Sequence, residues 1–141
     1  MFDELLEYSK HDHFFYSPNE SLVEKCNAPN NSSGIYLIYA LAHGNIELIY
    51  VGSSGKIQTN GKLKIRTGGI YDRIVNGIQF DEPRKKSWPK KMIEEEIEAL
   101  DIYWYETFNN ENKDLPTYAE AMIIQRHFDI YEKLPRWNVE F

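Results

Sequence analysis

The sequence predicts a mixed α/β fold, a small three-stranded antiparallel sheet flanked by helices, with a helical extension at the N-terminus. Residues 34–52 contain two β-rich runs separated by a Gly-Asn turn signal, which is typical of an antiparallel hairpin. Residues 101–108 are β-branched and aromatic and predict the third strand. Helical periodicity lies between these strands and after the last one, so the predicted order is hairpin, helix, helix, strand, long helix and tail.

Length and composition indicate one globular domain. The chain has 141 residues, of which 42% are hydrophobic and 27% charged, as is ordinary for a chain that buries one core. We expect residues 1–33 to form an N-terminal extension packed on the core and residues 34–141 to form the main domain. No apolar run approaches the roughly 18–20 residues that cross a bilayer, so no membrane is expected as a partner.

Cysteine usage favours a reducing compartment. The single cysteine, Cys26, cannot form a disulfide within the chain, and no group of Cys and His residues has the spacing of a zinc site. The N-terminus also lacks the basic and then apolar segments of a secretory signal peptide. A cytoplasmic location is therefore the expectation.

The register of the hairpin decides where its outer tyrosines, Tyr36 and Tyr50, point. A three-residue loop at 43–45 would place Ile38 opposite Tyr50, and the two tyrosines would share one face as diagonal neighbours. A two-residue turn at 44–45 would instead send them to opposite faces. Both rings could also be ordinary core aromatics, and the hairpin alone does not separate these alternatives.

Two segments outside the predicted sheet have weaker patterns. Residues 2–6 and 18–26 predict two short helices in the N-terminal extension. The glycine-rich stretch 53–69 predicts an irregular loop or a small ribbon, without the spacing of a phosphate-binding P-loop.

Residues 70–77 predict a short helix. Ile70 and Ile74 lie on one face of it, Ile78 extends that face, and Arg73 lies at its edge. The guanidinium of Arg73 is therefore expected at the rim of a packed surface rather than far out in solvent.

A second helix is predicted to open at residues 87–89, because proline is tolerated at the first helical position. The apolar positions between 92 and 100 recur at helical spacing and are expected to face the core.

The longest predicted helix, residues 117–133, carries a carboxylate at the edge of its apolar stripe. That stripe is predicted to consist of Ala121, Ile124, Phe128 and Tyr131. Because an unpaired charge is costly there, Glu120 needs a partner. Glu120 could close a capping box with Thr117, the alternative that the sequence pattern favours, or it could bind a metal ion.

Charge is unevenly distributed along the chain. The whole chain carries a net charge of −6, but residues 53–91 hold ten basic and three acidic residues, a net charge of +7. Such a segment can attract a phosphate backbone, although a solvated lysine-rich loop is an equal alternative. The candidate substrate-binding residues in it are Lys56, Lys64, Arg66, Lys85 and Lys86.

The triplets at 34–36 (Gly-Ile-Tyr) and 50–52 (Tyr-Val-Gly) resemble the two motifs of the GIY-YIG nuclease superfamily, with Val51 replacing isoleucine. The resemblance extends over residues 34–138, because the order of predicted elements agrees with the small α/β fold of that family. It is carried by Tyr36, Tyr50, Arg73, Glu120 and Asn138.

The resemblance implies a role for each matched residue. Glu120 would bind one divalent ion, Mg²⁺ or Mn²⁺, because such ions keep several waters and need few protein ligands. Arg73 would hold the phosphate oxygens. Tyr36 would accept the proton of the attacking water, with positive charge nearby to aid its ionisation. Tyr50 would position the water or phosphate, and Asn138 would fix a loop or the phosphate.

Two departures from the family pattern are visible. Many members carry His or Tyr four residues after the helix arginine, where this chain has Gly77. The stretch between Gly52 and Arg73 is also longer than in compact members, so Arg66 competes for the arginine role, although Gly68 and Gly69 disfavour a helix around it.

The sequence therefore predicts a divalent-metal-dependent endonuclease, with DNA favoured over RNA as its substrate. A catalytically weak or inactive nucleic-acid-binding module on the same fold is the main alternative, and a protein-interaction domain is a third. Double-strand cleavage would require two events or a homo-oligomer, and the sequence leaves the oligomeric state open.

Overall fold

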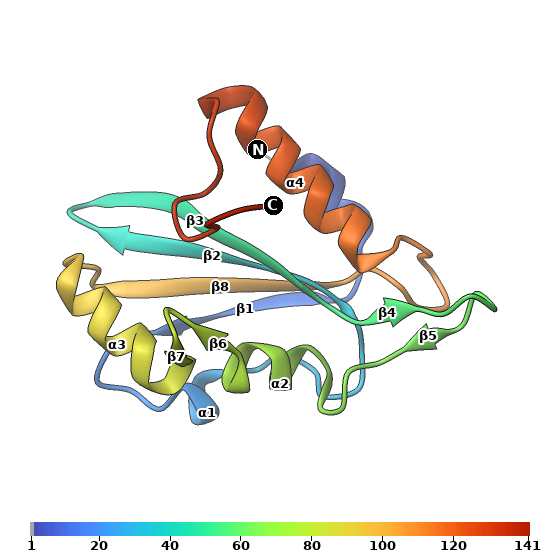
Figure 1. Ribbon diagram of the computed structural model, residues 1–141, viewed down its shortest axis with the longest axis horizontal. Helices are drawn as coiled ribbons and strands as arrows, with labels where there is room; N and C mark the ends of the chain where they lie inside the picture. Colours follow the sequence, from blue (N-terminus) through green and yellow to red (C-terminus); the bar gives the residue numbers. More distant parts are fainter. Residues whose placement is uncertain (1) are drawn as a thin grey trace.

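The computed structural model describes residues 2–141, and in that range it contains a four-stranded antiparallel sheet, two small two-stranded sheets and four α-helices (Figure 1). The elements in chain order are η1 (Asp3–Glu7), β1 (His11–Tyr16), α1 (Leu22–Lys25), β2 (Gly34–Ala42), β3 (Asn45–Ser54), β4 (Lys56–Ile57), β5 (Leu63–Lys64), α2 (Gly69–Asn76), β6 (Ile78–Gln79), β7 (Glu82–Pro83), α3 (Arg84–Glu94), β8 (Ala99–Glu106) and α4 (Pro116–Tyr131). Within this range, no helix combines the length and apolar composition needed to cross a membrane.

The main sheet has four strands in the order β1-β8-β2-β3, so the prediction of three strands was wrong. The fourth strand, β1, comes from the N-terminal extension, which was predicted to be helical. Phe14 and Tyr16 of β1 are buried on one face, while Phe15 points to the other and is 48% exposed. The segment before β1 forms only a five-residue 3-10 helix, because it is too short to propagate an α-helix.

The hairpin of β2 and β3 turns at His43 and Gly44, both at positive φ, as a tight two-residue turn requires. Neither predicted turn is therefore right. A β-bulge at Ile49 then shifts the register by one residue, so that Tyr50 lies opposite Ile38. The two tyrosines share one face, as the longer-loop alternative expected, but the bulge rather than the loop places them there.

The sheet separates two apolar clusters. On one face, α2 and α3 contribute side chains such as Ile74 and Trp88 to a cluster that also contains Tyr36. On the other face, α4 and η1 pack against Ile35 and Leu37 of the central strand β2. Figure 1 shows this arrangement, with α4 on one side of the sheet and α1, α2 and α3 on the other. The near-continuous apolar run in β2 is explained by this burial on both faces.

Helix α2 and the small ribbon β4–β5 agree with the prediction, but α3 begins earlier than predicted. It starts at Arg84 rather than at the Ser-Trp-Pro segment, and Pro89 lies in its interior. Burial of Trp88 and Met92, one helical turn apart, outweighs the hydrogen bond that Pro89 cannot donate. Ile78 does not extend the apolar face of α2 but lies in β6, 70% exposed.

Helix α4 buries Ile124, as predicted, but the rest of its buried stripe differs from the predicted one. Ala119, Ile123 and His127 face the sheet, whereas Phe128 and Tyr131 are about half exposed. The predicted capping box is absent, because Pro116 takes the first helical turn and leaves Thr117 inside the helix.

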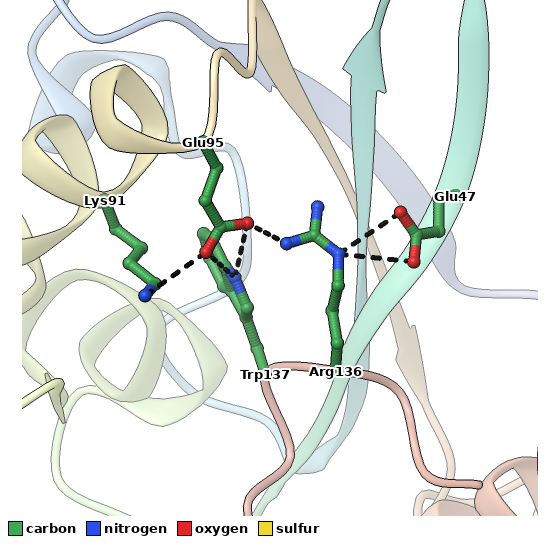
Figure 2. Close-up of polar contacts among 5 residues, drawn as sticks. All are labelled: Glu47, Lys91, Glu95, Arg136 and Trp137. Carbon is green, nitrogen blue, oxygen red and sulfur yellow. Dashed lines mark hydrogen bonds and ion pairs between the residues drawn. The ribbon is translucent and has the colours of Figure 1, made fainter.

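The C-terminal segment is held against the sheet by a polar network (Figure 2). Arg136 pairs with Glu47 of β3 and with Glu95 at the end of α3. Glu95 also forms an ion pair with Lys91 and accepts a hydrogen bond of 3.2 Å from the indole Nε1 of Trp137. Trp137 itself is buried, and its backbone N–H donates to the carbonyl of Ile49 at the bulge over 2.8 Å.

We expect Glu95→Ala to lower the free energy of unfolding by about 1–3 kcal/mol, because the buried indole N–H of Trp137 would lose its acceptor. Glu47→Ala is the matched control, since it removes only an exposed ion pair of Arg136 and should change the same quantity by less than about 0.5 kcal/mol. Chemical denaturation of both variants measures the difference, and equal losses would contradict the anchoring role of Glu95.

Candidate functional site

The two motif tyrosines lie together on the face of the sheet that α2 and α3 cover. The ring centroids of Tyr36 and Tyr50 are 6.0 Å apart. Tyr36 is fully buried, and its hydroxyl has no hydrogen-bond partner among the described residues. A Cβ at Gly52 would lie 2.5 Å from that hydroxyl, so only glycine lets the phenol rest over this point of β3.

Arg73 projects from α2 at the rim of the same region. Its side chain is partly exposed and lines an open cleft together with Ser53 and Thr117. Its positive charge acts on two neighbours, since it lowers the pKa of both Tyr50 and Glu120 against the stronger upward effect of their burial. The predicted position of this guanidinium at the helix edge agrees with the structure.

Glu120 reaches β3 rather than the start of its own helix. Its Oε1 accepts a hydrogen bond of 2.8 Å from the Ser53 hydroxyl. Burial raises the pKa of the Glu120 carboxyl above its usual value, and the bond from Ser53 and the charge of Arg73 oppose that rise. Ser53 was not predicted as a site residue, and its only sequence signal is that it directly follows the second motif.

These groups meet at the edge of the sheet rather than on one face. The tyrosines lie on the side of α2 and α3, whereas Glu120 comes from α4 on the opposite side. Because β3 is an edge strand, side chains from both sides converge around Gly52 and Ser53 without a further strand between them. Burial, followed by the proximity of Tyr36, raises the pKa of Tyr50 to about 12, with Arg84 and Arg73 acting in the opposite direction.

The side-chain amide of Asn138 forms two hydrogen bonds with the backbone of β3. Its Oδ1 accepts from the N–H of Val51 and its Nδ2 donates to the carbonyl of the same residue, both over 3.0 Å. The amide thus supplies the pairing that a neighbouring strand would give. Asn138 holds the strand that carries Tyr50, which matches the loop-fixing role expected for it more closely than contact with a phosphate.

Basic residues line the cleft beside this site. The cleft has a volume of about 410 Å³ and is bordered by the β4–β5 ribbon, α2 and the start of α4. Lys56, Lys64 and Arg66 line it together with Arg73. Arg66 lies in the loop between β5 and α2, outside the helix, and forms a 2.8 Å ion pair with Asp72 of α2.

Two of the predicted substrate-binding lysines lie elsewhere. Lys85 and Lys86 are exposed on α3 and are not among the residues that line the cleft. Lys85 lies close enough to Asp72 to help lower its pKa, after the larger effects of Asn76 and Arg66. The structure therefore brings three of the five lysine and arginine candidates together beside Arg73.

Arg84 is a buried residue of this region that the sequence did not single out. It is 1% exposed, and its guanidinium carbon lies 5.3 Å and 5.5 Å from the ring centroids of Tyr36 and Tyr50. A Cβ at Gly77 would lie 3.0 Å from its Nη1, so the absence of a side chain at 77 leaves room for this arginine. Nothing in the run Arg84-Lys85-Lys86 distinguishes the buried cation from its exposed neighbours.

The donor set fits a hard divalent ion held by one carboxylate. Within residues 2–141, no three His, Cys, Asp or Glu side chains gather as a metal site. Glu120 offers one oxygen that is not used by Ser53, and a cation there would offset the cost of burying its charge. Mg²⁺ and Mn²⁺ accept such a site because water and substrate oxygens complete their coordination.

Comparison of the chain with known protein families, curated proteins and solved structures finds no match.

We expect Glu120→Gln to raise the melting temperature near pH 7, because the amide can still accept from Ser53 while the buried charge is removed. A carboxyl whose pKa is raised by folding lowers stability above its folded pKa, and this loss disappears as the pH falls toward the unfolded value near 4.5. The advantage of the variant should therefore vanish in acid. Thermal melts across this pH range measure it.

Millimolar Mg²⁺ tests the metal assignment in the same melts. A ligand that binds only the folded state raises its stability, so Mg²⁺ should raise the melting temperature of the unmodified protein and not that of Glu120→Gln. Equal responses of the two proteins would argue against Glu120 as the ligand.

Proposed function

We propose that this protein is a divalent-metal-dependent endonuclease of the GIY-YIG type that hydrolyses phosphodiester bonds in nucleic acid, with DNA as the favoured substrate. One observation supports this proposal above the others. The tilted ring pair of Tyr36 and Tyr50, the Arg73 guanidinium and the Glu120 carboxyl lie around the same edge of β3, and Arg73 also lines the adjoining cleft of basic side chains.

The chemistry of these groups suits phosphodiester hydrolysis. Arg73 can bind two non-bridging phosphate oxygens through its planar guanidinium while the basic cleft binds the flanking backbone. Tyr36 accepts the proton of the attacking water, and Tyr50 orients that water or the phosphate. Asn138 keeps β3, and with it Tyr50, in place through Val51.

A divalent ion bound by Glu120 would neutralise charge on the phosphate and on the departing oxygen. The protein's own part in that step is to hold the carboxylate in a half-buried position through Ser53, where a cation is favoured.

The uneven charge of the chain is consistent with local binding of a phosphate backbone. The segment 53–91 is basic although the whole chain carries a net charge of −6. Its cleft-lining residues Lys56, Lys64 and Arg66 would attract the backbone to one side of the molecule, while the acidic remainder disfavours wrapping around it.

A nucleic-acid-binding module without strong catalysis is the second candidate, and one observation favours it. The Tyr36 hydroxyl is fully enclosed, so water reaches it only if the rings move. Gly77 also supplies no polar group where many GIY-YIG proteins have one.

Plasmid nicking in Mg²⁺ or Mn²⁺ separates the two candidates. We expect the unmodified protein to nick, and Glu120→Ala and Arg73→Ala to lose at least about 100-fold in rate, since each removes charge stabilisation of the transition state. Asp129→Asn is the matched control on α4, nine residues beyond Glu120, and it should nick at the normal rate.

The outcome without nicking is also informative. If all four proteins fail to nick but bind DNA with an affinity that falls steeply with salt, the binding module is the better description, because phosphate contacts release counterions. Binding that is independent of salt would remove the basic cleft from both candidates.

We expect Tyr36→Phe to retain or gain stability, by up to about 1 kcal/mol, because the lost hydroxyl is buried without a partner. If Tyr36 is the base, the same variant should lose about 100-fold or more in nicking rate. A stable variant that nicks at the normal rate would exclude Tyr36 as the base and leave the remaining site unaffected.

A further inference from the structure

Arg84 is a buried cation for which no described residue supplies a negative charge. Its Nε donates to the side-chain oxygen of Gln79 over 3.1 Å, and its Nη1 donates to the backbone carbonyl of Arg73 over 2.9 Å. Both acceptors are neutral, and among residues 2–141 no carboxylate forms an ion pair with it. A charge buried in this way is unfavourable unless something compensates it.

Three aromatic rings supply part of that compensation. The guanidinium carbon lies 5.1 Å from the ring centroid of Trp88 and at similar distances from Tyr36 and Tyr50. Ring faces attract a cation, but each does so weakly compared with a full negative charge. Of these three rings only the tyrosines can acquire a full negative charge, by losing the phenolic proton.

We propose that Arg84 is a positioning residue that supplies the positive charge against which the tyrosine pair, Tyr36 and Tyr50, ionises. This role deepens the proposed nuclease function and rests on it for its biological meaning. Arg84 acts through the tyrosines and not on the substrate, because its side chain is almost completely buried.

Ionisable groups from four neighbouring elements act on Tyr50, and two further carboxylates, Asp81 of the β6–β7 turn and Glu140 of the C-terminal segment, line the cleft that its ring borders. Arg84 of α3 and Arg73 of α2 favour the ionised form, whereas Tyr36 of β2 and Glu120 of α4 oppose it. Arg73 is partly exposed and is free to turn toward a phosphate, but Arg84 is fixed by its two hydrogen bonds. Arg84 is therefore a fixed cation beside the tyrosine rings, whereas Arg73 can bind the phosphate of the substrate.

The test places difluorotyrosine, whose phenol ionises at lower pH than that of tyrosine, at position 50. Its titration is followed by fluorine NMR in the intact chain with EDTA present, so that no metal contributes charge. We expect Arg84→Met to raise the pKa of the probe by about one unit or more, as loss of a close opposite charge does. Arg84→Lys should retain most of the lower value.

Two further variants keep the test decisive. Lys90→Met removes a positive charge from the same helix, but Lys90 pairs with Glu82 and contacts neither ring, so it should leave the probe unchanged. If Arg84→Met fails to fold, Gln79→Glu places a carboxylate at the atom that now accepts from Arg84. It should raise the probe pKa while keeping the same bonds.

The outcomes distinguish a failure of the Arg84 proposal from a failure of the proposed nuclease function. A probe pKa that stays the same in folded Arg84→Met and in Gln79→Glu would overturn the role of Arg84. If the probe shifts as expected, the pH at which nicking reaches half its maximal rate should rise by the same amount in Arg84→Met. Unmodified protein that never nicks would instead refute the nuclease, while the probe still decides whether Arg84 controls ionisation of the tyrosines.

Discussion

Ile49, the extra residue in β3, decides on which face of the sheet Tyr50 lies. In an uninterrupted ladder from the His43-Gly44 turn, Tyr50 would pair with Leu37 and its ring would lie on the side of α4, away from Tyr36. The bulge moves the ring to the other face. The carbonyl of Ile49 accepts from the N–H of Trp137, so the C-terminal segment and the bulge support each other.

The free edge of β3 is the second constraint on the site. A site on one face of the sheet would have needed all its groups from α2 and α3, but here Glu120 arrives from the opposite layer. This is possible because no strand formed by residues 2–141 lies beyond β3 and because Gly52 carries no side chain beneath the Tyr36 ring. The side chain of Asn138 replaces strand pairing at one residue only, next to the site.

In this region the pKa values of the ionisable groups depend on two opposing effects, burial and the charges of nearby arginines. Burial raises the pKa of both Tyr50 and Glu120, and arginines on two different helices oppose that rise. Arg84 occupies the space beside Gly77 that a side chain at position 77 would fill. In the sequence Gly77 lacks the polar group that many GIY-YIG proteins carry there, whereas in the structure the glycine makes room for the buried arginine.

Elements whose residue pattern is local could be predicted from the sequence. Short-range periodicity predicts the β2–β3 hairpin, α2, β8 and α4. The position of Arg73 at the edge of α2 follows from its spacing relative to the apolar residues of that helix. The pairing of β1 with β8, the bulge at Ile49 and the burial of Arg84 could not be predicted and became visible only in the folded structure. The reason is physical: a periodic pattern records which face of an element is apolar, whereas these features depend on which distant surface that face meets.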